Sequence, residues 1–268
     1  MKMVAFCFAA AATALGGCAS PELNFVHMAD SQFGFYDYEA ELGRYREAVG
    51  MINADVGGYH PAFMLMCGDM VNIPTAAHNA DFLAASKPLD IPYYVVPGNH
   101  DLNANPETVK LYHDSFGPDY YTFDSGAYRF IVVNTNLWKY PQARTGAMDE
   151  WLVKAFEQAE SDGKIIMVAG HSPLFLKTAD EPEDKYYNLS PERRKWVLDL
   201  FRKYGVIAYF GGHSHTRIDN TWEGIRFLHS ENVCTNFDNR PFGYRIVMVR
   251  GREVSDCFVP LDSTCRAE

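Results

Sequence analysis

The chain has 268 residues, of which 47% are apolar and 14% are aromatic. This composition predicts a compact globular body and excludes a disordered chain. The formal net charge of −10 would repel long polyanions from most of the surface, which argues against nucleic acid as a partner.

The N-terminus has the pattern of an export signal. Lys2 precedes an apolar run over residues 4–15, which is too short to span a bilayer as a helix. The segment Leu15-Gly16-Gly17-Cys18 then resembles the lipobox of bacterial lipoproteins, in which the cysteine is acylated and begins the mature chain. We expect residues 1–17 to be a signal peptide and the protein to be exported to the periplasm or cell surface, with a lipid on Cys18 as its one membrane attachment. A plain signal peptide cut after residues 12–14 is the alternative.

The sequence pattern over residues 18–268 predicts a single domain. Apolar runs of strand length alternate with amphipathic helical stretches, as in an α/β fold. We expect buried strands at residues 24–28, 62–67, 91–96, 164–168 and 206–210, and helices at residues 38–53, 79–86, 149–161 and 191–204. Further strands at residues 120–123, 128–133, 225–229, 244–249 and 253–259 are joined by turns containing glycine, as in hairpins. Two sheets are therefore expected, with no repeat or linker that marks a second domain.

Metal-binding side chains follow each of the five buried strands. In chain order, these residues are Asp30 and Gln32, then Asp69, then Asn99 with His100 and Asp101, then His171, and finally His213 and His215. Because the carboxyl ends of strands in open α/β sheets converge on one crevice, we expect these side chains to meet. A set of oxygen and nitrogen donors without thiolate suits Mn, Fe or Zn.

These motifs resemble those of the calcineurin-like metallophosphoesterases. The ordered set Asp-x-Gln, Gly-Asp, Gly-Asn-His-Asp, Gly-His and Gly-His-x-His follows that family's order over residues 24–262. Segments outside the metal motif, such as residues 29–34 and 171–176, look closest to the subgroup of serine/threonine phosphatases that carry this domain and to their bacterial lipoprotein-type relatives. The resemblance implies an α/β (α+β) fold, a four-layer αββα sandwich of two mixed β-sheets flanked by helices.

The resemblance also implies a ligand set for two metal ions, Mn, Fe or Zn. One ion would be held by Asp30, Gln32, Asp69 and His215, and the other by Asp69, Asn99, His171 and His213. Asp69 would bridge, because a carboxylate can span two cations and an imidazole nitrogen cannot. Gln32 stands where the superfamily usually has histidine, and its weaker donor predicts loose binding or none at the first position. Asn72 stands where purple acid phosphatases have a tyrosine ligand, which argues against an iron-tyrosinate centre.

The implied reaction is in-line attack on phosphorus by a hydroxide that bridges the ions. His100 would protonate the leaving oxygen and Asp101 would orient the loop, so these two residues are the predicted catalytic pair. We expect hydrolysis of phosphate monoesters, with a phosphorylated small molecule or a phosphoprotein as substrate. Two alternatives stay open: a phosphodiesterase acting on nucleotides or phospholipid headgroups, and a metal-binding surface protein without turnover.

Two loops are long enough to contribute to substrate binding, at residues 137–148 and 177–188. The second carries four acidic residues beside Tyr186 and Tyr187, which would suit a cationic or aromatic part of a substrate, or form a solvated turn.

Other polar residues have plainer interpretations. We expect packing or surface roles for His27, His60, His78, His113 and His229, and a solvated cluster at Arg193, Arg194 and Lys195. Cys67 and Cys234 are expected as buried thiols, and Cys257 and Cys265 are close enough in sequence for a disulfide loop.

Overall fold

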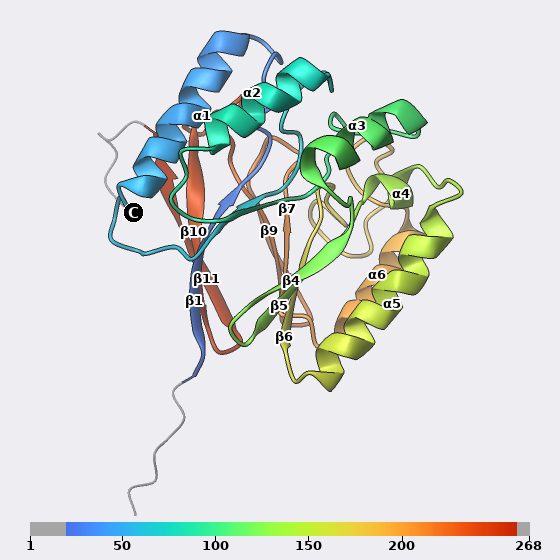
Figure 1. Ribbon diagram of the computed structural model, residues 1–268. Coiled ribbons are helices and arrows are strands. Elements are labelled where there is room, and N and C mark those ends of the chain that lie inside the picture. Colours follow the sequence, from blue (N-terminus) through green and yellow to red (C-terminus); the bar gives the residue numbers. More distant parts are fainter. Residues whose placement is uncertain (1–19, 262–268) are drawn as a thin grey trace, which may run out of the picture.

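Two β-sheets face each other in the computed structural model, which describes residues 20–261 (Figure 1). The first sheet has the order β11-β10-β1-β2-β3. Its strands are β1 (Glu22–Met28), β2 (Met64–Met66), β3 (Tyr93–Val95), β10 (Gly243–Arg250) and β11 (Glu253–Pro260). It is mixed, because β1 runs parallel to β2 and antiparallel to β10.

The second sheet has the order β4-β5-β6-β7-β9-β8. Its strands are β4 (Tyr121–Ser125), β5 (Tyr128–Val132), β6 (Ile165–Ala169), β7 (Ala208–Gly211), β8 (Ile218–Trp222) and β9 (Ile225–His229). The central strands from β5 to β9 are parallel, and the edge strands β4 and β8 are antiparallel to their neighbours. The parallel strands therefore end at one edge of the sheet.

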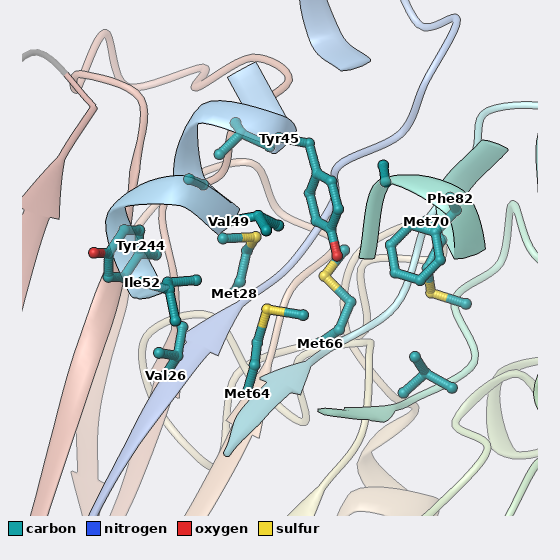
Figure 2. Packing of buried hydrophobic residues seen from close by; sticks show 14 of the residues in the cluster. Val26, Met28, Tyr45, Val49, Ile52, Met64, Met66, Met70, Phe82 and Tyr244 are labelled. Carbon is teal, nitrogen blue, oxygen red and sulfur yellow. The ribbon is translucent and has the colours of Figure 1, made fainter. Parts of the chain in front are cut away.

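Helices cover the outer face of each sheet. Those over the first sheet are α1 (Tyr38–Asn53), α2 (Ala76–Ser86) and α3 (Pro106–Phe116), and those over the second are α5 (Thr145–Ser161) and α6 (Pro191–Lys203), while α4 (Asn136–Lys139) is a single turn. Strand alternation separates the layers: on β1, Val26 and Met28 pack under the helices, whereas Phe25 lies between the sheets against Phe130 and Phe210. In Figure 2, Tyr45 and Val49 of α1 lie over these β1 side chains. The four-layer αββα prediction is confirmed.

Start signals in the sequence fix where the helices begin. Asp37 accepts a hydrogen bond from the Ala40 backbone at the start of α1, and Ser190 accepts one from Arg193 before α6. The prediction for α1 is confirmed residue for residue. The sequence prediction omitted α3 and β8, although Asn105 caps α3 and Pro106 opens it in the usual order of a helix start.

The predictions for the two termini lie outside the described residues, which applies to the signal peptide, to Cys18 and to Cys265. Between residues 20 and 261, no helix combines the length and apolar character needed to cross a membrane. Cys67 and Cys234 are buried as free thiols, which confirms that prediction.

Candidate metal centre

The predicted ligands lie on the loops that follow the carboxyl ends of five strands. Asp30 and Gln32 follow β1, Asp69 follows β2, Asn99 follows β3, His171 follows β6, and His213 and His215 follow β7. All of them are buried except Asn99, which is half-buried. The strand ends of both sheets thus deliver polar side chains to the interior, where each needs a partner.

Four of these residues form one cluster around Asp69. The Nε2 atom of His171 lies 3.1 Å from Oδ2 of Asp69 and 3.2 Å from Oδ1 of Asn99. Donor atoms of Asp69, His171 and His213 all lie within 4.8 Å of one another. Nδ1 of His171 is 2.8 Å from the Cys67 carbonyl oxygen, so a proton there leaves the Nε2 lone pair directed at the cluster. This is the set predicted for the second ion.

Among the residues predicted for the first ion, Asp30 and His215 lie close to each other. Nε2 of His215 is 3.6 Å from Oδ1 of Asp30, and its Nδ1 is 2.9 Å from the Thr235 carbonyl oxygen. Oε1 of Gln32 is buried and has no hydrogen-bond partner among the described residues, while its Nε2 donates to Asn72 over 3.4 Å. Because a buried amide oxygen costs free energy unless it is paired, a cation at this position would satisfy it. The donor set therefore fits metal ions at both positions.

Backbone strain marks the same loops. Five predicted ligands have the left-handed conformation that side chains rarely adopt, with φ of 52° at Asp30, 37° at Gln32, 53° at Asp69, 70° at His213 and 50° at His215. Such conformations cost about 1–3 kcal/mol each and cluster at functional sites. The Asp30 and Gln32 backbones are held by hydrogen bonds of 2.9 Å to the carbonyls of Gly68 and Asp69. The loops after β1 and β2 therefore hold each other in the strained state.

Glycines before the ligands permit close approach. A Cβ atom on Gly98 would lie 2.0 Å from Oδ1 of Asp69, and one on Gly212 would lie 2.5 Å from Oδ2 of Asp30. Neither position has room for a side chain. Contact with the facing carboxylate thus explains the glycines at positions 98 and 212, whereas a Cβ atom on Gly68 would meet the His171 ring and one on Gly170 the Tyr209 hydroxyl.

The predicted catalytic pair occupies the loop after β3. The backbone N–H of His100 donates to Oδ1 of Asp69 over 2.8 Å, and its Nδ1 lies 2.8 Å from the Asn72 carbonyl oxygen. The buried Asp101 carboxylate accepts from the backbone N–H of Gly98, Asp69 and Met70 at 2.7–2.8 Å. Asp101 therefore links the loops after β2 and β3, which supports the orienting role predicted for it.

The loop at residues 177–188 reaches the centre through its backbone. The Tyr186 carbonyl oxygen lies 2.8 Å from Nε2 of His213. Arg194, expected to be solvated, is fully buried, so that prediction was wrong. Its guanidinium donates to the carbonyls of residues 174, 179, 181 and 189, because its five N–H groups can satisfy several oxygens of a folded loop at once.

Comparison with known proteins decides the family. Residues 23–217 match the family described as calcineurin-like phosphoesterase. The chain belongs to the calcineurin-like phosphoesterases. It is 29% identical over 264 residues to the human serine/threonine-protein phosphatase CPPED1, covering 89% of this chain and 83% of that protein. It is 27% identical over 175 residues to the probable glycerophosphodiester phosphodiesterase GpdQ of Arcobacter nitrofigilis, covering 63% of this chain and 62% of that protein.

A solved structure shows the same fold. The crystal structure of a dimetal phosphatase from Danio rerio superposes with a TM-score of 0.61 at 14% identity, over 90% of this chain and 99% of that one. The predictions of family, fold and enzyme class, a metallophosphoesterase on the phosphatase side, are confirmed. The roles of individual site residues stay predictions.

In this calcineurin-like phosphoesterase, the surroundings of two predicted ligands of the second ion shift their pKa values in opposite directions. Burial, with the nearby His171, lowers the pKa of His213 to about 3, so its ring is neutral near pH 7. Burial would also lower the pKa of His171, but the charge of Asp69 outweighs it and raises that pKa to about 9. Because a metal binds neutral imidazole, binding would release the His171 proton.

Several residues that support the phosphoesterase loops were not predicted. His27 and His229 are packing residues, as expected, yet their ring nitrogens also lie 3.0 and 2.9 Å from the carbonyl oxygens of Gly211 and Gly212, just before His213. Asn136 donates to the Gly98 carbonyl over 2.9 Å. Glu41 is fully buried and accepts backbone N–H groups of residues 34–37. An acidic residue in the first turn of a helix is usually solvated, so its sequence position does not indicate this role.

Proposed function

We propose that the chain hydrolyses phosphate monoesters at a centre of two metal ions, Mn, Fe or Zn, with Asp69 as the bridging ligand. The observation that carries this proposal is the cluster of Asp69, His171 and His213, together with the buried Asp30 and Gln32, whose backbone N–H groups donate to the carbonyls of Gly68 and Asp69. A phosphorylated small molecule or a phosphoprotein is the proposed substrate.

Bound ions would act as Lewis acids on the phosphoryl oxygens and lower the pKa of water to produce the nucleophile. The chain itself positions the groups around them. The His100 N–H fixes the Asp69 carboxylate, and the Asn72 carbonyl orients the His100 ring through Nδ1. Because Nδ1 is engaged with that carbonyl, the proton transfer to the leaving oxygen that we assign to His100 would come from Nε2.

The relatives named serine/threonine-protein phosphatase favour monoester hydrolysis, because they match more of the chain than the phosphodiesterase does. The human serine/threonine-protein phosphatase matches 89% of this chain, whereas the probable glycerophosphodiester phosphodiesterase matches 63%. A phosphodiesterase is therefore the second candidate. A binding protein without turnover is the third, because Gln32 supplies a weak donor at the first position.

The ester class is tested with metal-stripped protein to which Mn, Zn, Fe or Mg is added back. Metal-dependent hydrolysis of p-nitrophenyl phosphate in preference to bis-p-nitrophenyl phosphate is expected. The reverse preference would support the diesterase. Stoichiometric metal binding without hydrolysis of either ester would support the binding protein.

A lipid anchor at Cys18, with export to the periplasm or cell surface, is a separate proposal that the Leu15-Gly16-Gly17-Cys18 motif supports. Mass spectrometry of the mature N-terminus tests it. An acylated Cys18 is expected, and a chain that begins at another residue without lipid would contradict it.

A further inference from the structure

Exposed apolar side chains of this protein gather on the loops around the metal centre. Over residues 20–261, the large apolar side chains with the greatest exposure are Tyr36 at 75%, Ile73 at 58%, Tyr140 at 53%, Tyr186 at 51%, Phe237 at 49% and Val56 at 40%. Val56 follows the C-terminal end of α1, whereas Tyr36 precedes its N-terminal end, about 24 Å away for a helix of this length. Exposed apolar groups that gather in one place mark a binding surface more often than scattered ones do.

On one side of the centre, aromatic rings form a continuous chain that includes His215. The Phe237 ring stacks on the His215 ring with centroids 4.8 Å apart and planes 15° apart. The Phe35 ring lies 5.5 Å from that of His215 and 4.6 Å from that of Tyr36. The exposed faces of Tyr36 and Phe237 are thus connected through Phe35 and His215 to the predicted first metal position.

On the other side, two tyrosines lie against His213. Ring centroids of Tyr186 and His213 are 4.9 Å apart, and those of Tyr187 and His213 are 5.8 Å apart. Both imidazoles of the Gly-His-x-His motif therefore have aromatic neighbours that reach solvent. We call Phe35, Tyr36, Tyr186, Tyr187 and Phe237 the aromatic surface.

Hydrogen bonds hold the backbone beneath these rings. The buried Glu41 carboxylate accepts from the N–H of Tyr36 at 2.8 Å and of Phe35 at 3.1 Å. Oδ1 of Asp184 accepts from the N–H of Tyr186 at 2.9 Å, and the Phe237 N–H donates to the His215 carbonyl over 2.7 Å. The backbone that carries the exposed rings is therefore fixed before a ligand arrives, which lowers the entropic cost of binding.

Shielding of the metal from water would explain only part of this arrangement. Phe237 covers one face of a predicted ligand, His215. The Tyr36 ring packs edge to face against Phe35 and remains 75% exposed. Its ring covers no ligand, yet its backbone is fixed by Glu41, so a contact with something from solution accounts for it better.

We propose that the aromatic surface binds the leaving group of the substrate and makes the enzyme prefer phosphate monoesters whose leaving group carries an aromatic ring. The inference rests on the proposed function, because that function places the phosphoryl group beside His213 and His215. A ring on the leaving group would then stack on Tyr36 and Phe237, and aromatic pairs of this kind add to the affinity supplied by area alone.

The test uses two phosphonates that the enzyme cannot hydrolyse, 2-phenylethylphosphonate and ethylphosphonate. Calorimetry on metal-loaded wild type is expected to show about fivefold tighter binding of the phenyl compound, as one or two aromatic contacts would give. Tyr36→Ala and Phe237→Leu should each bring the affinity ratio close to one. Val56→Ala, at the remote end of α1, is the matched control and should keep the wild-type ratio.

Equal affinities in wild type, no measurable binding of either phosphonate, or a ratio that both variants preserve would each overturn the inference. Its failure can be separated from that of the proposed function, because p-nitrophenyl phosphate is assayed on the same samples. Hydrolysis with equal phosphonate affinities defeats the aromatic surface alone. If wild type binds 2-phenylethylphosphonate more tightly than ethylphosphonate but hydrolyses no ester, the aromatic surface is supported as a binding site and the proposed function is defeated.

Discussion

In the proposed mechanism, metal binding and proton transfer around Asp69 fall to different groups. His100 shows this separation: its backbone N–H donates to the Asp69 carboxylate, whereas its ring is turned to the Asn72 carbonyl. Replacing the ring should leave the metal positions unchanged and remove only the proton donor.

For His100→Ala we predict a fall in kcat of about 100-fold or more, the usual contribution of a general acid, with metal content unchanged. Steady-state kinetics and elemental analysis of the same preparation check this. His60→Ala is the control, because the His60 side chain is 86% exposed and lies outside the centre. Wild-type turnover in His100→Ala would remove His100 from its assigned role.

The predicted ligands could be named from sequence because each follows a buried apolar run, and all but Asp30 and Gln32 also follow a glycine, a pattern that depends only on neighbours along the chain. Glu41 and Asn136 could not be identified from the sequence. Each contacts backbone groups that the fold brings near, such as the Gly98 carbonyl for Asn136, and no local pattern marks them. Arg194 was misassigned for the same reason, since its acceptors lie up to 20 residues away.

Among the elements, α6 supports the loop that carries Tyr186. Its Arg194 side chain has no exposed surface and donates four hydrogen bonds to that loop and its flanks. Removing it would leave buried carbonyl oxygens without partners, each of which costs free energy.

For Arg194→Ala we expect the free energy of unfolding to fall by about 3 kcal/mol or more, measured by urea denaturation at pH 7. Lys195→Ala is the matched control. Its side chain is 76% exposed and pairs with Asp199 one turn along α6, so a change within about 0.5 kcal/mol is expected. Similar losses in the two variants would contradict the role of Arg194 in holding the loop.

The bounds of α1 were predictable, because its buried side chains recur at helical spacing along the whole helix. The α3 helix was omitted although Val109, Tyr112 and Phe116 recur at the same spacing, so the pattern was present in the sequence and was overlooked. The β8 strand, Ile218–Trp222, alternates buried and exposed residues but carries Asp219 and Asn220, which are depleted in strands. The position of β8 at the edge of the sheet explains both why it carries polar residues and why the sequence pattern did not predict it as a strand.

At the scale of the whole molecule, a buried charge network joins the two sheets. Asp256 on β11 accepts hydrogen bonds from Arg245 of the same sheet, from Arg226 on β9 of the other sheet and from Arg217, which directly precedes β8. Burial would raise the pKa of Asp256, but the charges of these arginines outweigh it and lower that pKa below its usual range.

Because the folded-state pKa is depressed, Asp256 contributes stability above its unfolded-state pKa of about 3.9, and that contribution is lost as the pH falls through the folded value. For Asp256→Asn we expect a loss of about 3 kcal/mol at pH 7 and a smaller loss toward acid pH, measured by urea denaturation. Asp114→Asn, which alters an exposed pair with Lys110, should change stability by less than about 0.5 kcal/mol at either pH. If the loss of unfolding free energy in Asp256→Asn did not change with pH, the depressed pKa of Asp256 would not be its cause.

Metal content is the most direct test of a two-ion centre bridged by Asp69. Elemental analysis of wild type and of Asp69→Ala, with p-nitrophenyl phosphate turnover measured on the same samples, gives both stoichiometry and activity. We predict two ions per chain and metal-dependent turnover in wild type, and loss of both ions and of turnover in Asp69→Ala, because one carboxylate serves both positions. One ion or none in active wild type, or two ions retained by Asp69→Ala, would contradict the bridged centre.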